Sequence, residues 1–140
     1  MLRAPARHGL IRDGDADAGS FCHVDERIRA KAVQHALDCV DVMDLTGSRD
    51  LKVWLPDGLN YPGQGDLRDR QDRLADSLQQ VYARLGEHQR LVLEYKFFEP
   101  AFYATDVPDW GTAYVQCAAL GERAVVCLDT GHHAPGTNIE

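Results

Sequence analysis

Residues 90–96, which read Arg90-Leu91-Val92-Leu93-Glu94-Tyr95-Lys96, give the clearest indication of the fold. An apolar run that ends directly in a glutamate is typical of a strand buried on both faces, with polar groups at its carboxyl end. Two other stretches have the same form, Leu51-Lys52-Val53-Trp54-Leu55 and Ala124-Val125-Val126-Cys127-Leu128. Turn residues follow the first of these, and Asp129 follows the second. We therefore predict three short strands.

Amphipathic helices are predicted before and between these strands. Residues 25–46 carry apolar side chains at helical spacing, with Asp25 as a plausible N-cap and a glycine directly after the last turn. Residues 66–85 and 108–120 are predicted as two further helices, the second with Pro108 at its start. Residues 56–65 form a loop rich in Gly, Pro and Asn. Apolar strands alternating with helices indicate an α/β fold with parallel strands, either part of a barrel or a doubly wound sheet.

Length and composition exclude several classes of protein. The 140 residues include 44% hydrophobic and 26% charged residues, as in ordinary globular domains. The net charge of −7 argues against a nucleic-acid partner, and no stretch approaches the ~20 apolar residues of a membrane helix. The basic N-terminus lacks the apolar core of a signal peptide, so we expect a cytoplasmic protein. Residues 1–18 are expected to form a loose arm.

The cysteines show no metal or redox pattern. Cys22, Cys39, Cys117 and Cys127 are far apart and form no C-x-x-C pair. In a chain with no export signal we expect reduced thiols that behave as small buried apolar residues. The sequence also contains no G-x-S-x-G, Walker or G-x-G-x-x-G motif placed after a strand.

Functional groups of parallel α/β proteins lie at the carboxyl ends of the strands, and here those ends are polar. Glu94 and Asp129 directly follow apolar runs, and His132 lies three residues after Asp129. Two carboxylates and one imidazole suit Mn²⁺, Mg²⁺, Co²⁺ or Zn²⁺. The alternative for each acid is a salt bridge or a helix cap. The adjacent His133 must point elsewhere and is expected to be structural or to support the site.

Two more residues are candidates for substrate contact. Lys96 is two residues after Glu94 and therefore shares its face of the strand, where its charge could polarise a substrate oxygen. The alternative is a plain Glu–Lys pair. Trp54 shares a face with Lys52 and could form an apolar wall of a sugar site. The alternative for Trp54 is a place in the core.

Several longer motifs together resemble one known family. They are DLKVWLPDG at 50–58 with NYPGQ at 60–64, LEYKFFEPAFY at 93–103, DWGT at 109–112 and DTGHHAPGTNIE at 129–140. In this order they resemble the bacterial L-rhamnose isomerases of the xylose-isomerase-like TIM-barrel superfamily. The resemblance runs from about Gly19 to the last residue, so residues 19–140 are expected to be the central part of such a barrel.

The resemblance implies a fold, a reaction and a set of site residues. The family's (β/α)₈ barrel binds divalent metals, usually Mn²⁺, and converts L-rhamnose to L-rhamnulose by a metal-assisted hydride shift. Its members are expected to be homo-oligomers, with four subunits. By resemblance, Glu94 and Asp129 would hold the structural metal and His132 would bind the catalytic metal. Lys96 would be catalytic, and Trp54, together with Lys96 and His132, would contact the sugar.

The resemblance also implies an incomplete enzyme. A (β/α)₈ barrel needs about 250 residues, and this chain supplies about three βα units. The family's remaining metal ligands come from later strands, so we expect the chain alone to be inactive.

Two other functions remain open on the sequence. One is a non-catalytic remnant of the barrel that binds a sugar or a partner chain through open sheet edges. The other is a metal-dependent phosphodiesterase of the endonuclease IV kind. The net charge of −7 and the position of Lys96 beside Glu94 argue against the phosphodiesterase.

Overall fold

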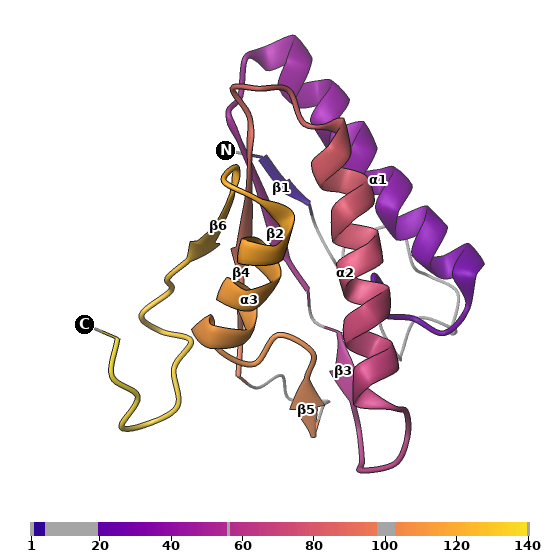
Figure 1. Ribbon diagram of the computed structural model, residues 1–140, viewed down its shortest axis with the longest axis vertical. Helices are drawn as coiled ribbons and strands as arrows, with labels where there is room; N and C mark the ends of the chain where they lie inside the picture. Colours follow the sequence, from indigo (N-terminus) through magenta and orange to yellow (C-terminus); the bar gives the residue numbers. More distant parts are fainter. Residues whose placement is uncertain (1, 5–19, 56, 98–102, 140) are drawn as a thin grey trace.

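Four parallel strands form the central sheet of the computed structural model (Figure 1), which describes residues 2–4, 20–55, 57–97 and 103–139. The strands lie side by side in the order in which they occur along the chain. They are β1 (Leu2–Ala4), β2 (Asp50–Trp54), β4 (Arg90–Glu94) and β6 (Ala124–Cys127). The connections between successive strands of this sheet contain, in order, the helices α1 (Glu26–Thr46), α2 (Leu67–Arg84) and α3 (Trp110–Leu120). The predicted α/β fold with parallel strands is confirmed, and it is consistent with part of a TIM barrel.

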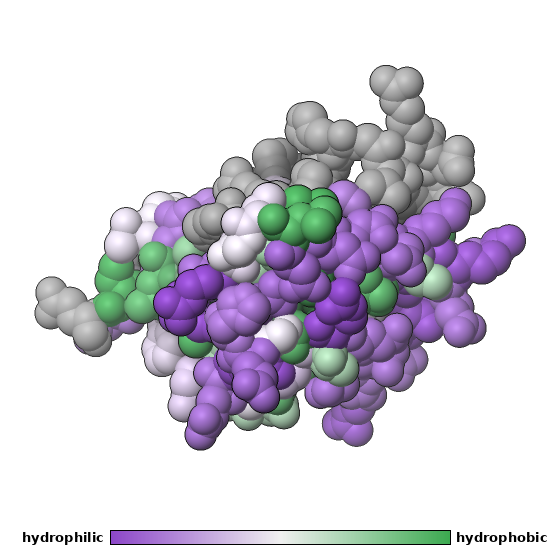
Figure 2. All heavy atoms as spheres, turned by 90° about the horizontal axis from the view of Figure 1, so that it is seen from above, coloured by the Kyte–Doolittle hydropathy of each residue, from purple (hydrophilic) through white to green (hydrophobic). Residues whose placement is uncertain are grey.

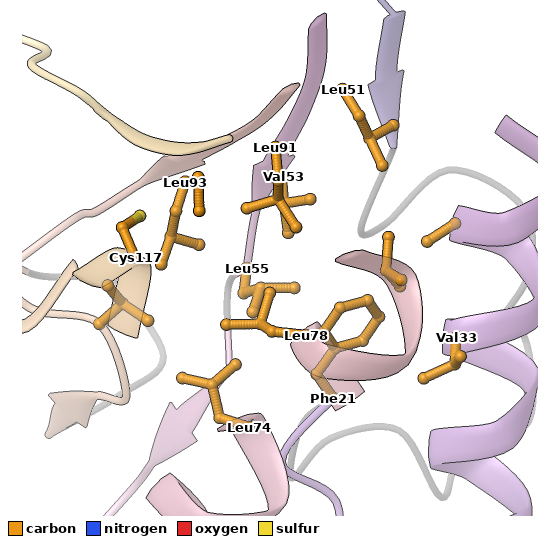
Figure 3. Close-up of a cluster of buried hydrophobic side chains, with 14 of the residues drawn as sticks. Phe21, Val33, Leu51, Val53, Leu55, Leu74, Leu78, Leu91, Leu93 and Cys117 are labelled. Atoms are coloured by element: carbon orange, nitrogen blue, oxygen red, sulfur yellow. The ribbon is translucent and has the colours of Figure 1, made fainter. Parts of the chain in front are cut away.

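One face of this sheet forms the hydrophobic core. Because side chains alternate along a strand, Leu51 and Val53 of β2 and Leu91 and Leu93 of β4 point to the same face (Figure 3). Residues of α1, α2 and α3 belong to the same buried cluster, among them Val33, Leu74, Leu78 and Cys117. The three helices therefore cover one face of the sheet, and the even-numbered residues of β2 and β4 point to the other face.

The predicted helices are present, with small differences at their ends. Asp25 caps α1 and accepts a hydrogen bond from the backbone N–H of Arg27 at 2.8 Å, and Gly47 ends the helix with a φ of 68°. The cap of α3 is Asp109, which accepts from the N–H of Thr112 at 2.7 Å. This helix therefore begins two residues after Pro108, because the Asp109 side chain satisfies a free N–H of its first turn.

A second, two-stranded sheet was not predicted. Its strands are β3 (Gly58–Leu59) and β5 (Ala104–Thr105), which pair antiparallel with Gly58 opposite Thr105. The loop prediction for residues 56–65 was therefore wrong at β3, because two residues are too few to show a period of two. This pairing ties together the segments that leave β2 and β4 at the carboxyl end of the main sheet (Figure 1).

The strand β1 lies within the arm expected at residues 1–18. It pairs with β2 in parallel, with Leu2 opposite Leu51, and three residues are again too few for a periodic signal. Most of the expected arm, at residues 1 and 5–18, lies outside the described residues. Viewed from above in Figure 2, the surface is mainly hydrophilic, with separate hydrophobic patches. Among the described residues, no helix is both long and apolar enough to cross a membrane.

Candidate functional site

The predicted site residues at the end of β4 and in the segment after β6 meet at the carboxyl end of the sheet. Glu94 is the last residue of β4 and lies opposite Cys127, the last residue of β6. The chain then turns, and the N–H of His132 donates to the carbonyl of Asp129 at 3.0 Å. This turn directs the Asp129 and His132 side chains toward Glu94.

The three side chains form a compact cluster. The Nδ1 atom of His132 lies 3.6 Å from Oε1 of Glu94 and 3.7 Å from Oδ2 of Asp129. One potential ligand atom from each residue lies within 4.8 Å of those of the other two. The Glu94 side chain is fully buried, whereas the side chains of Asp129 and His132 are 38% and 23% exposed. The cluster is therefore closed beneath Glu94 and accessible from the side of Asp129.

Backbone groups hold this cluster in place. The N–H of Gly131 donates to Asp129 at 2.9 Å and is the main reason that the pKa of Asp129 is lowered. A protonated His132 and the Lys52 ammonium lower that pKa further. The His132 Nδ1 atom donates to the carbonyl of Tyr95 at 3.0 Å. Asp129 is thus held as a carboxylate, the form that binds cations.

His133 points away from this cluster. Its Nε2 atom lies 2.6 Å from the hydroxyl of Tyr95, and the two rings meet edge to face with their centroids 5.2 Å apart. The two adjacent histidines therefore have different environments, and the contact with the buried Tyr95 gives His133 a structural partner.

Lys52, a residue of the neighbouring strand β2, forms an ion pair with Glu94. The Lys52 ammonium lies 2.6 Å from Oε2 of Glu94, and its side chain is only 12% exposed. From the sequence, Lys96 is the expected lysine beside Glu94, and Lys52 is placed only on the same strand face as Trp54. The signal for Lys52 was a lysine inside an otherwise apolar strand, on the face that it shares with Trp54. The missing information was the register, which places Trp54 opposite Glu94 and Lys52 one diagonal step away.

Lys96 and Trp54 lie against each other. The Lys96 ammonium is 5.6 Å from the centroid of the Trp54 ring, a distance that allows a cation–π interaction. The indole Nε1 of Trp54 is buried, and no hydrogen-bond acceptor for it is found among the described residues. Because Trp54 lies opposite Glu94, both residues belong to the same end of the sheet as the carboxylate cluster.

The donor set fits a divalent metal. Both carboxylate oxygens of Glu94 are buried, and within the described part of the chain neither accepts a hydrogen bond of good geometry. The ion pair with Lys52 is the contact that compensates the charge of Glu94 there. Two carboxylates and an imidazole that can be brought onto one ion match the preferences of Mn²⁺ and similar cations.

A second group of potential ligands, made of Cys22, Asp57 and Asp106, has a structural role. Asp57 accepts hydrogen bonds from the N–H and hydroxyl of Ser20 and from the N–H of Cys22. Asp106 accepts two hydrogen bonds from Arg70, at 2.8 and 2.6 Å. Burial raises the pKa of the Cys22 thiol well above 9.0, whereas metal binding needs the thiolate. Protein groups already satisfy these acids.

Comparison with known proteins gives the family of the chain. Residues 9–140 match the family described as L-rhamnose isomerase (RhaA). The chain belongs to the L-rhamnose isomerase family. This confirms the resemblance seen in the sequence, and the match begins ten residues before the predicted start at Gly19 (19 − 9 = 10).

The relatives of the chain are considerably longer. A probable sugar isomerase of Rhizobium meliloti (strain 1021) is 46% identical over 122 residues, which are 87% of this chain and 28% of the relative. A probable sugar isomerase of Mesorhizobium japonicum (strain LMG 29417 / CECT 9101 / MAFF 303099) is 45% identical over 122 residues, with the same two coverages. The chain thus spans about 28% of the length of these two relatives.

Proposed function

We propose that this chain supplies part of the active site of a metal-dependent isomerase that interconverts L-rhamnose and L-rhamnulose. The observation that carries the proposal is the cluster of Glu94, Asp129 and His132 at the carboxyl end of a parallel sheet, within a chain of the L-rhamnose isomerase family. In the full protein we expect a homo-tetramer, as the family resemblance implies, and we expect this protein in the cytoplasm.

Glu94, Asp129 and His132 would hold the metal. Following the family resemblance, Glu94 and Asp129 serve the structural ion and His132 serves the catalytic one, with Mn²⁺ as the expected metal and Zn²⁺, Co²⁺ and Mg²⁺ as alternatives. When bound, such a metal supplies Lewis-acid polarisation of the substrate oxygens. His132 must be neutral to act as a ligand.

Lys96 would stabilise the charge that develops during the reaction. Converting the aldose to the ketose moves a hydride from C2 to C1, while the C2 hydroxyl loses a proton and the C1 oxygen gains one. Negative charge therefore develops on an oxygen bound to C1 or C2. A lysine ammonium that donates a hydrogen bond to this oxygen lowers the barrier. Its position over the Trp54 ring places it beside a surface suited to a sugar.

Trp54 would bind the sugar itself. An aromatic face packs well against the C–H groups of a sugar. The Nε1–H of Trp54, which has no acceptor among the described residues, can donate to a sugar hydroxyl. An indole with both properties would orient the open-chain substrate next to Glu94, the residue opposite Trp54 in the sheet.

We further propose that the 140-residue chain does not turn over L-rhamnose alone. Three ligands from two strands are too few for a pair of metal ions, each of which needs several protein donors. The purified chain with Mn²⁺ should therefore produce no L-rhamnulose. Steady ketose formation by that preparation would refute this part of the proposal.

The function itself is best tested in a complete barrel. The matched segment of the Rhizobium meliloti relative would be replaced by the corresponding segment of this chain, and ketose formation from L-rhamnose would be measured with Mn²⁺. We expect turnover that Glu94→Gln, Asp129→Asn and His132→Asn each reduce by about a hundredfold or more. Glu122→Gln, which changes an exposed acid by the same chemistry, should keep full activity.

Two outcomes of this experiment would contradict the proposal. A folded chimera that converts other aldoses with Mn²⁺ but leaves L-rhamnose unchanged would refute the substrate. A chimera in which the three site variants retain the activity of the Glu122→Gln control would refute the assignment of the site.

A further inference from the structure

Glu94 has a buried cationic partner that neither the sequence motifs nor the family comparison assigns. The Lys52 ammonium lies 2.6 Å from Oε2 of Glu94, with Lys52 12% exposed and Glu94 fully buried at their side chains. Placing two such charges inside a protein is costly, and removing one partner leaves the other uncompensated. The lysine must therefore have a strong effect on the state of this carboxylate.

The two oxygens of Glu94 face different partners. Oε1 faces the Nδ1 atom of His132 at 3.6 Å, whereas Oε2 faces Lys52. One oxygen thus belongs to the cluster with Asp129 and His132, and the other is engaged by the ammonium. A metal ion that binds this cluster meets a carboxylate whose charge is already partly neutralised.

The charge of Lys52 reaches beyond Glu94. Lys52 engages Oε2 of Glu94, while Oε1 of the same carboxylate faces the His132 Nδ1 atom, which lies 3.7 Å from Oδ2 of Asp129. With neutral His132, Glu94 and Asp129 give the site a formal charge of −2, and Lys52 reduces it to −1. Because a divalent ion is repelled by a nearby ammonium, this difference acts directly on metal affinity.

We propose that Lys52 is a positioning residue that acts as the resident counterion of Glu94, stabilising the metal-free chain and weakening the binding of divalent metal. The inference rests on the proposed function only in taking Glu94, Asp129 and His132 as metal ligands. Because the Glu94 carboxylate interacts with both the Lys52 ammonium and the metal ion, Lys52 would determine how tightly the site binds the metal.

Metal affinity gives the first test. Binding of Mn²⁺ alone to the 140-residue chain would be measured by calorimetry for the unmodified chain and for three variants. Lys52→Met removes the charge and keeps the length of the side chain, and it should bind Mn²⁺ about tenfold more tightly. Lys52→Arg keeps the charge and should bind within about threefold of the unmodified chain. Lys31→Met removes the same charge from an exposed position of α1 and should have no effect.

Stability without metal gives the second test. In the presence of a chelator, Lys52→Met should unfold at a lower urea concentration than Lys31→Met, because Glu94 is left buried without its partner. Adding Glu94→Gln to Lys52→Met should recover most of the lost stability, because the uncompensated charge is then gone. This double variant also keeps the test possible if Lys52→Met alone folds poorly.

The two proposals fail in different ways. If the unmodified chain binds Mn²⁺ and folded Lys52→Met binds it equally or less tightly, the role of Lys52 is refuted and the metal site stands. If no variant binds Mn²⁺, the metal site is refuted for this chain, and the stability measurements then decide on Lys52. Additive effects of Lys52→Met and Glu94→Gln on unfolding would show no coupling and would overturn the counterion role.

Discussion

At the scale of single residues, the Asp25 carboxylate caps the start of α1, and its contribution to stability depends on pH. Its side chain accepts hydrogen bonds from the side chain and the backbone N–H of Arg27, and these lower the pKa of Asp25 to about 2. A carboxylate at an N-cap also interacts favourably with the positive end of the helix dipole. The charged form of Asp25 therefore stabilises the start of α1.

This arrangement predicts a pH-dependent effect of Asp25→Ala. The pKa of the carboxyl group is lower in the folded chain, about 2, than in the unfolded chain, about 3.9. Its stabilisation is fully present above the unfolded value and is lost as the pH falls through the folded value. The Tm of Asp25→Ala should thus lie below that of the unmodified chain at pH 6, and the difference should shrink toward pH 2.

Asp72→Ala is the matched control for this measurement, because Asp72 is an exposed acid of α2. Thermal unfolding followed by circular dichroism at several pH values would give both differences. A constant Tm difference for Asp25→Ala from pH 6 to pH 2 would contradict the role assigned to its charge.

Single residues of the site could be predicted to different degrees. Glu94 and Asp129 are conspicuous in the sequence because each follows an apolar run, and the structure brings both together with His132. Lys52 lies 42 residues before Glu94 (94 − 52 = 42). Its contact depends on the register between β2 and β4, which the period of a single strand does not contain.

At the scale of elements, the helices could be predicted because their caps are local. Asp25 and Gly47 bound α1 as expected. The pairing of β3 with β5 could not be predicted, because it joins two-residue segments 45 positions apart (Ala104 and Leu59). The loops that it connects determine where such a short pairing forms, and two-residue strands leave almost no hydrophobic pattern in the sequence.

The segment after β5 is attached to α2 by a buried ion pair, which gives an element-scale prediction. Arg70 donates two hydrogen bonds to Asp106, and the two side chains are 5% and 1% exposed. Arg70→Met should reduce the free energy of unfolding by about 3–5 kcal/mol, because Asp106 is left charged and buried. Urea unfolding would measure the loss.

Two comparisons make this prediction specific. Combining Arg70→Met with Asp106→Leu removes both charges and should recover much of the stability. Arg84→Met breaks the exposed contacts of Arg84 with Asp41 and Asp44, and it should cost about 1 kcal/mol or less. Equal losses for Arg70→Met and Arg84→Met would mean that burial does not determine the strength of the α2 pair.

At the scale of the whole molecule, the side of the sheet on which the helices lie distinguishes two architectures. The sequence left open a barrel or a doubly wound sheet, because both alternate strands with helices. In the structure the four strands follow chain order, and residues of all three helices join one core cluster. Helices on a single face are the arrangement of consecutive βα units of a barrel. Which face a helix covers depends on long-range packing, so the helical period alone could not decide it.

The accessibility of the cysteines can be used to test whether this core unfolds as one unit. Cys22 and Cys117 are buried in the core cluster. Burial raises the pKa of Cys22 well above 9.0 and that of Cys117 to about 11, so both thiols are protonated and shielded. Cys127 is partly exposed and is opposite Glu94 in the sheet. The expectation of buried cysteines therefore holds for Cys22, Cys39 and Cys117 but not fully for Cys127, which points away from the helices.

We predict that a thiol reagent at pH 8 modifies Cys127 rapidly in the native chain and reaches Cys22 and Cys117 only through unfolding. Cys127→Ser should remove the fast phase and leave the slow phase unchanged. Because the slow thiols belong to a core that joins all three helices to the sheet, their labelling should accelerate with urea in parallel with the loss of helical circular dichroism. Rapid labelling of Cys117 without urea would instead mean that α3 detaches from the sheet separately, and that the core does not unfold as one unit.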